Sequence, residues 1–292
     1  MNETANRLMK SQPNCKINLG LRVLRKRQDG YHDLATVFLP VPLCDELTIE
    51  PCADGVDDCH FTQSGIVVDC PLEDNICVKA YRLLKADYPQ LPSVRMHLHK
   101  RVPFGAGLGG GSSDAAFTLK MLNELGQLGL SSRTLRDYAA RLGADCAFFV
   151  DNCPAYATGI GDRLCPLGFD PLRGYRIVMA KPDEAVSTRE AYGGLKIAGT
   201  TDVKEYDLME TSPLCRALGQ PVSTWREQVV NDFEATVFPL HPAIARLKQL
   251  FYDYGAAYAS MSGSGATVFA LFPEDASLPT ALLDALGGMR LL

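Results

Sequence analysis

The chain has 292 residues, of which 47% are hydrophobic, and a formal net charge of −5. This is about twice the length of a typical domain of roughly 150 residues, so two domains with separate cores are expected. The acidic balance argues against nucleic acid as a partner, because nucleic-acid-binding domains carry clustered basic surfaces. It does not exclude a phosphorylated ligand, since a pocket of amides and lysines can be locally positive.

No apolar stretch approaches the roughly 20 residues that cross a bilayer, so no membrane partner is expected. The N-terminal residues contain no apolar segment before a cleavage-like site, which favours a cytoplasmic protein. Ten cysteines occur, and none forms a CxxC pair. Separate reduced thiols are therefore expected rather than a zinc site. The sequence carries no signal for an oligomeric state.

Strands and helices alternate along the chain, which indicates the α+β class. Hydrophobic periodicity predicts strands at residues 15–24, 34–39, 46–51, 94–100, 155–158, 175–180 and 267–272. It predicts helices at residues 75–88, 115–125, 131–143, 188–195, 227–237 and 242–254. The polar segment 53–71 is compatible with a hairpin. A loop-like stretch at 166–174 places the domain boundary between domains 1–167 and 168–292.

The densest signal is the segment PFGAGLGGGSSD at residues 103–114. Glycines let the backbone approach a phosphate closely, and consecutive amides form an anion-binding concavity. The helix that follows adds free N–H groups and the positive end of its dipole. A flexible linker is the alternative, but a linker would not need to connect a strand directly to an amphipathic helix. The residues expected to contact phosphate are Pro103, Gly105, Gly107, Leu108, Gly109, Gly110, Gly111, Ser112 and Ser113.

This loop is neither of two common nucleotide motifs. It lacks the G-x-x-x-x-G-K-[ST] pattern of a Walker A loop. Its glycines do match the dinucleotide fingerprint G-x-G-x-x-G, and the acidic residue Glu124 follows. In a Rossmann unit, however, that acid ends the next strand, whereas Glu124 lies in the helix that the loop itself opens.

Lys16 and Asp145 each stand in apolar surroundings, where a charge is costly without a partner. If they met in a pocket, Asp145 could accept a proton from a hydroxyl group, and Lys16 could neutralise phosphate charge. A lysine extending from an edge strand and an aspartate capping a turn are equally compatible with the sequence. The later loop of Gly263, Ser264 and Gly265 could be a hairpin turn or a second set of amides facing the first glycine loop.

Three motifs occur in order: PNCKINLGLRVLRKRQDGYHDLATVF, PFGAGLGGGSSDAA and MSGSGATVFALF. Together they resemble the GHMP kinases. The Lys-x-Asn strand and the DGYH turn are similar to those of the 4-diphosphocytidyl-2-C-methyl-D-erythritol kinase family, and GADCAFF and NDFE at 231–234 fit the same family. The resemblance covers nearly the whole chain. It implies two α+β domains with the active site in the cleft between them.

The resemblance also implies a reaction and its residues. ATP, with Mg²⁺ as its nucleotide complex, would phosphorylate the 2-hydroxyl of the cytidyl substrate in isoprenoid precursor biosynthesis, giving the 2-phosphate and ADP. Asp145 would be the catalytic base and Lys16 its partner, and no metal ligand is assigned to the protein. The residues implied in binding are Asn18, Tyr31 and His32 for the cytidine diphosphate, Gly105 to Ser113 for the ATP phosphates, Asn75 and Lys100 near the adenine and phosphates, and Gly263 to Gly265 closing the site.

Two other functions fit the same motifs. Another GHMP kinase, acting on mevalonate, homoserine or a sugar, would lack the cytidine pocket. A non-catalytic nucleotide-binding protein of this fold would not need both Lys16 and Asp145, and both are present.

Overall fold

The computed structural model describes residues 8–52, 59–68, 70–195 and 203–292. Its residues form two compact units, each discontinuous in sequence. The first unit comprises Met1–Cys15, Pro40–Phe104 and Gly109–Cys153. The second comprises Lys16–Leu39, Gly105–Leu108 and Pro154–Leu292. Helices and strands are mixed in both, as the α+β class requires, and the linear boundary after residue 167 stays a prediction.

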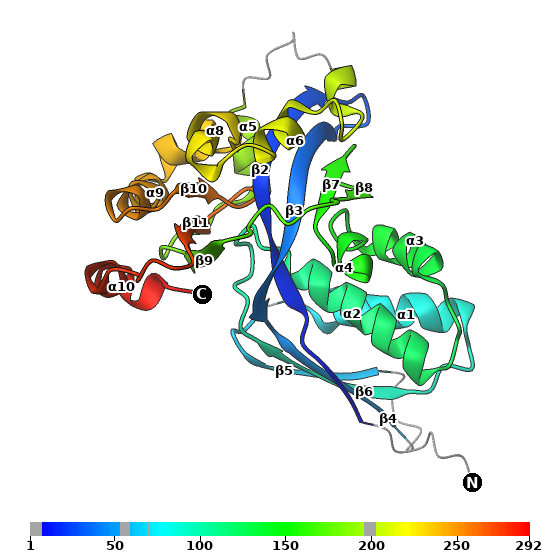
Figure 1. Ribbon diagram of the computed structural model, residues 1–292. Helices are drawn as coiled ribbons and strands as arrows, with labels where there is room; N and C mark the ends of the chain where they lie inside the picture. The colour runs from blue at the N-terminus through cyan, green and yellow to red at the C-terminus, as the bar shows by residue number, and fades with distance from the viewer. Residues whose placement is uncertain (1–7, 53–58, 69, 196–202) are drawn as a thin grey trace. The chain divides into compact units, whose positions relative to one another are not determined.

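A four-stranded sheet forms the base of the first unit (Figure 1). Its strands lie in the order β1 (Met9–Ser11), β4 (Glu46–Pro51), β6 (Val94–Lys100) and β5 (Cys59–Gly65). The bounds of β4 and β6 were predicted from the sequence. The hairpin expected in segment 53–71 was wrong for its described part, because β5 pairs in parallel with β6 instead. Residues 53–58 and 69 of that segment lie outside the described residues.

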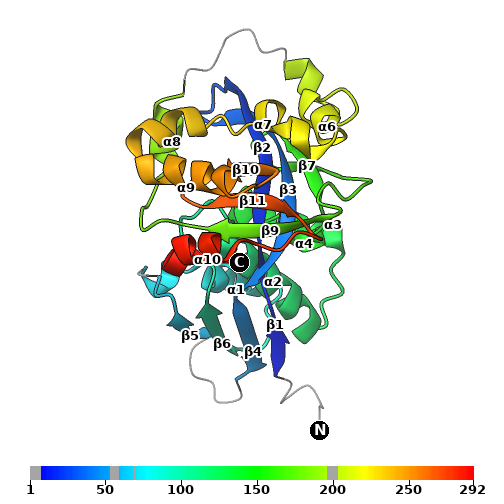
Figure 2. The same ribbon diagram turned by 60° about the vertical axis from the view of Figure 1, so that its left-hand side comes forward.

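Helices cover one face of this sheet (Figures 1 and 2). Val94, Met96 and Leu98 of β6 point to that face and are buried, which confirms the predicted alternation. The long helix begins at Gly110, before its predicted start at 115, so the last glycines and both serines of the loop are helical. The helices of this unit are α1 (Ile76–Asp87), α2 (Gly110–Leu125), α3 (Ser132–Leu142) and α4 (Phe148–Asp151), with a 3-10 turn at Leu72–Asp74.

The second unit contains most of a four-stranded sheet and the whole of a three-stranded sheet. One has the strand order β2 (Asn14–Lys26), β3 (His32–Cys44), β7 (Ala155–Thr158) and β8 (Arg163–Pro166). The other has the order β10 (Tyr258–Met261), β11 (Val268–Pro273) and β9 (Tyr175–Ala180). Helix α9 packs on β10 and β11, as Figure 2 shows, and closes an apolar core with Ile244, Leu247 and Phe251.

The single helix predicted at 227–237 was wrong, because two short helices occupy that region. Between them, the chain pairs with β2: the Leu21 N–H donates to the Val230 carbonyl at 2.9 Å, and the Asp232 N–H donates to the Leu21 carbonyl at 2.8 Å. This long-range pairing replaces the helical hydrogen bonds. The helices of this unit are α5 (Thr188–Gly193), α6 (Pro213–Leu218), α7 (Trp225–Gln228), α8 (Glu234–Leu240), α9 (Pro242–Asp253) and α10 (Thr280–Leu286), with 3-10 turns at Val203–Tyr206, Val222–Thr224 and Gly287–Met289.

Across the described ranges, no helix has the length and apolar character that crossing a membrane requires. No disulfide joins the ten cysteines, all of which lie among the residues that the structure describes.

Candidate active site

Lys16 projects from β2 into the interior of the second unit and is only 4% exposed. Its Nζ donates hydrogen bonds to Asn18 Oδ1 at 2.6 Å and to the Gly107 carbonyl at 3.3 Å. It also lies 5.0 Å from the centre of the Phe38 ring. These contacts compensate part of the cost of burying the ammonium group, and they bring the lysine strand to the glycine loop.

Asn18 is oriented by its own neighbours. Its Nδ2 donates to Thr36 Oγ1 at 3.0 Å, which leaves the amide oxygen facing Lys16. Its backbone N–H donates to Ser262 Oγ at 3.2 Å. The two motif residues of β2 therefore belong to one buried hydrogen-bond network with the loop at 262–265.

The two glycine loops of the second unit lie in direct contact. Ser262 Oγ donates to the Gly107 carbonyl at 2.9 Å, and a Cβ placed on Gly107 would lie 2.0 Å from the Ser262 carbonyl oxygen. The hairpin interpretation of the later loop is confirmed, because it connects the antiparallel strands β10 and β11. That its amides form a second anion-binding set stays a prediction. Its position is fixed by Asn231, whose Nδ2 donates to the carbonyls of Met261 at 2.7 Å and Gly263 at 2.8 Å.

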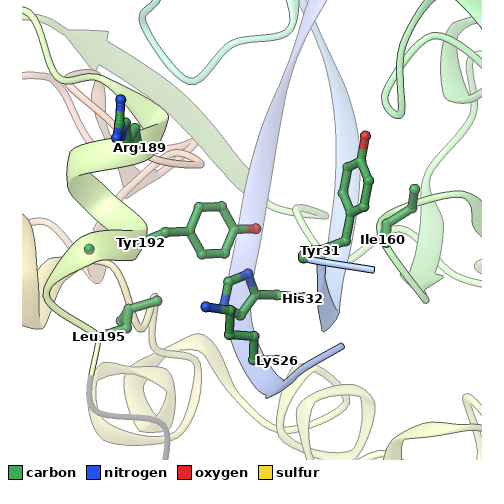
Figure 3. Close-up of a pocket in the computed structure, with 9 residues that line it drawn as sticks. Lys26, Tyr31, His32, Ile160, Arg189, Tyr192 and Leu195 are labelled. Carbon is green, nitrogen blue, oxygen red and sulfur yellow. The ribbon is translucent and has the colours of Figure 1, made fainter. Parts of the chain in front are cut away.

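A pocket of about 540 Å³ lies elsewhere in the same unit, between the β2–β3 turn and α5. Its size is within the range of small-molecule sites. The Tyr192 ring points from α5 toward the turn and stacks on His32 with ring centres 4.5 Å apart (Figure 3). Tyr31 is 60% exposed at the pocket rim. Its lining residues are Lys26, Gly30, Tyr31, His32, Ile160, Arg189, Tyr192, Gly193 and Leu195.

Charge and turn geometry prepare this pocket for a ligand. Burial lowers the pKa of His32, and the Lys26 ammonium acts in the same direction, so the imidazole is neutral at neutral pH. Lys26 and Arg189 have no carboxylate partner among the residues that the structure describes. The Asp29 carboxylate accepts the Tyr31 N–H at 3.1 Å and holds the turn. The pocket thus combines aromatic surfaces with two available cations.

The remaining predicted residues lie in the first unit. Asn75 caps α1, accepting the Cys77 N–H on its side-chain oxygen at 3.0 Å. Pro103 enters the glycine loop, and Gly109 to Ser113 form the cap and first turn of α2. Ser113 Oγ is buried there without a hydrogen-bond partner in the described part of the chain. A buried donor at a helix N-terminus fits a phosphate oxygen as its partner.

Asp145 lies half-buried on the turn before α4. Its neighbour Cys146 adjoins the first turn of α2: burial raises the pKa of this thiol to about 11, and a hydrogen bond with Ser112 opposes the shift. The aspartate turn and the phosphate-loop helix are therefore packed together within one unit. The described residues contain no cluster of three histidine, cysteine, aspartate or glutamate side chains that could hold a metal ion.

Two family profiles match the chain: GHMP kinases N terminal domain over residues 75–159 and GHMP kinases C terminal over 216–285. The 4-diphosphocytidyl-2-C-methyl-D-erythritol kinase of Bacteroides thetaiotaomicron is 48% identical over 91% of this chain and 93% of its own length. The chain belongs to this family of GHMP kinases. The enzyme of the same name from Cytophaga hutchinsonii is 48% identical over 90% of this chain and 92% of its own length.

Solved structures agree with this GHMP kinase assignment. A crystal structure of 4-(cytidine 5'-diphospho)-2C-methyl-D-erythritol kinase matches with a TM-score of 0.75 and 32% identity, covering 95% of each chain. The mevalonate kinase of Methanococcus jannaschii matches with a TM-score of 0.69 at 11% identity, over 98% of this chain and 96% of its own. That likeness confirms the shared fold alone. The predicted fold family and the ATP-dependent small-molecule kinase class are thereby confirmed.

Proposed function

We propose that this kinase transfers the γ-phosphoryl group of ATP to the 2-hydroxyl of 4-diphosphocytidyl-2-C-methyl-D-erythritol, giving the 2-phosphate and ADP. The reaction belongs to the methylerythritol phosphate route to isoprenoid precursors. The observation that carries the proposal is the high identity to relatives of that name along nearly the whole chain. The aromatic, cationic pocket at the DGYH turn supports the same substrate, whose base and diphosphate need both features.

Asp145 is the proposed general base. Its carboxylate would accept the proton of the substrate hydroxyl as the oxygen attacks the γ-phosphorus. Lys16 would neutralise the negative charge that develops around the transferring phosphoryl group. Its short hydrogen bond to Asn18 holds the ammonium group in a defined place before any substrate arrives.

The glycine loop is the proposed ATP phosphate site. Gly105 has open space where a Cβ would stand, so its backbone is accessible to a ligand. The buried Ser113 hydroxyl at the start of α2 has the donor that a phosphate oxygen would satisfy. Asn75 would lie near the adenine, and the loop of Gly263, Ser264 and Gly265 would close the site. Mg²⁺ bound to ATP would offset phosphate charge, as it does in kinases generally.

The cytidine would occupy the pocket in the second unit. Its base would stack on Tyr31 or Tyr192, and the neutral His32 imidazole would hydrogen-bond its edge. Lys26 and Arg189 would face the diphosphate. Asn18, which orients Lys16, would lie toward the reacting end of the substrate.

Replacing Tyr31 with alanine is expected to raise the KM for the cytidyl substrate about fivefold or more, because stacking a base on an aromatic ring contributes roughly 1–3 kcal/mol. The KM for ATP should stay within about twofold, since the change removes no contact to the glycine loops. Initial-rate kinetics at varied concentrations of each substrate measure both values. Phe169, an exposed aromatic residue of the same unit, provides the matched Phe169→Ala control. An unchanged cytidyl-substrate KM in Tyr31→Ala would argue for a different acceptor.

The substrate itself is tested by ADP release from the purified protein with ATP and Mg²⁺. The acceptors compared are the cytidyl substrate, mevalonate, homoserine, galactose and none. Turnover with the cytidyl substrate alone is the expected result. Turnover with another acceptor would be consistent with the proposed phosphoryl transfer but would contradict the proposal that the pocket binds cytidine.

A further inference from the structure

A buried ion bridge joins the strand before the glycine loop to the helix after it, wholly within the first unit. Lys100 Nζ, at the end of β6, donates hydrogen bonds to Asp45 Oδ2 and, at 2.7 Å, to Asp114 Oδ2. The three side chains are 3%, 0% and 2% exposed, respectively. The family resemblance implies that Lys100 lies near the adenine and phosphates of ATP, and its ammonium group is held by two buried carboxylates.

Asp45 connects the bridge to the segment that enters the loop. Its second oxygen, Oδ1, accepts the backbone N–H groups of Arg101 at 2.6 Å and Val102 at 2.8 Å. Its own N–H donates to the Pro13 carbonyl at 2.9 Å. The carboxylate therefore fixes the chain immediately before Pro103, where the loop begins.

Asp114 connects the bridge to the helix that leaves the loop. It stands in α2, one turn after Gly110. A Cβ on Gly110 would lie 2.8 Å from Val102 Cγ1 and 3.1 Å from Lys100 Nζ, so the first residue of the helix rests directly on the bridge. The strand that enters the loop and the helix that leaves it are thus tied to one ammonium group.

The charged groups of the cluster shift one another's pKa values. Burial raises the pKa of Asp114 to about 8, with Asp45 acting in the same direction and Lys100 opposing it. Burial lowers the pKa of Lys100, but the two carboxylates outweigh it and leave the value above its ordinary range. Two thiols also interact with the cluster: burial and Asp114 raise the pKa of Cys77 in α1, and burial and Asp45 raise the pKa of Cys44.

We propose that Lys100 is a positioning residue: by bridging Asp45 and Asp114, it sets the separation between the two ends of the phosphate loop. It would act on ATP through the loop amides and not by touching a phosphate, because its ammonium group is buried between two acceptors. This inference rests on the proposed role of the glycine loop in binding the ATP phosphates.

The test is the affinity for ATP with Mg²⁺, measured by calorimetry without any acceptor. K100M and D114A should each weaken ATP binding about tenfold or more, a loss of roughly 1.4 kcal/mol or more, because each removes the bridge. D114N should retain affinity within about threefold, since its amide oxygen still accepts a hydrogen bond from Lys100. In the steady state, K100M should leave the KM for the acceptor within about twofold.

A matched control lies at the next residue. Arg101 forms an exposed ion pair with Glu46, and R101M should leave ATP affinity within about twofold because exposed pairs contribute little. K100M leaves two buried carboxylates without a cation, so K100M/D114N is measured beside it, together with thermal unfolding of each variant. This double variant also lacks the bridge and should lose ATP affinity to the same extent.

Wild-type ATP affinity in K100M/D114N would overturn the proposal. A second result would also overturn it: weak ATP binding by K100M/D114N combined with wild-type ATP affinity in D114A. Lys100 would then be needed for ATP binding although the bridge to Asp114 is not, which means that the lysine contacts ATP directly. The calorimetric titration contains ATP and Mg²⁺ but no acceptor. If the proposed acceptor is wrong, the ADP-release assay will show it, and the ATP affinities of the variants can still be compared.

Discussion

Asp145→Asn is expected to lower kcat by about 10²- to 10⁴-fold, the usual contribution of a positioned general base. The amide keeps the shape of the carboxylate but cannot accept the proton of the substrate hydroxyl. Affinity for ATP should change by less than about threefold, because the change affects proton transfer and not the glycine loop. Single-turnover kinetics and ATP titration separate the two effects.

Asp151 offers the matched control for that experiment. It lies on α4, a short distance along the chain from Asp145, and forms an ion pair with Arg136 at 2.6 Å. Asp151→Asn removes the same charge from a surface pair and should leave kcat within about twofold. Near-normal turnover in Asp145→Asn would mean that another group takes the proton.

Gly107→Ala is the second substitution with a large expected effect. Gly107 has φ +75°, a conformation that costs an alanine about 1–2 kcal/mol, and the added Cβ would lie 2.0 Å from the Ser262 carbonyl oxygen. The two glycine loops must then move apart, which also disturbs the carbonyl that accepts from Lys16 and Ser262. We expect kcat/KM for ATP to fall more than about tenfold and the unfolding midpoint to fall by about 4 °C or more.

Gly105→Ala separates the two causes of the lower stability of Gly107→Ala, which are the positive φ and the clash with the Ser262 carbonyl. Gly105 also has positive φ, +63°, but a Cβ there would meet nothing within 4 Å. It should therefore lower the unfolding midpoint by the backbone cost alone, and by less than Gly107→Ala. Equal losses of stability in the two variants would mean that the contact with Ser262 contributes nothing measurable.

Local patterns in the sequence predicted much of the fold. Strand β6 alternates apolar and polar residues, and its bounds follow directly from that period. The motifs around Lys16, Gly107 and Gly263 were each recognisable, and the structure brings them together in the second unit. Asp145, in the first unit, stays a prediction as the base.

The residues that the sequence did not reveal are those whose partners are remote along the chain. Asp45 stands in an unremarkable segment, and its role depends on residues more than 50 positions away. Asn231 lies in a segment with a helical sequence pattern, but the chain there pairs with Leu21 instead of continuing a helix. Its side chain then fixes a loop 30 residues later by donating to the Met261 carbonyl. No local period or composition carries such information, because the deciding hydrogen bonds form only in the folded chain.

The hydrogen bond between Ser262 and Gly107 can form only late in the synthesis of the chain. The two residues are 155 positions apart, so the ribosome releases the glycine-rich segment long before the hydroxyl that supports it exists. Asn231, which fixes the later loop, also emerges late. A nascent chain ending at residue 153 would therefore contain the whole glycine-rich segment without the Ser262 hydroxyl that supports residues 105–108.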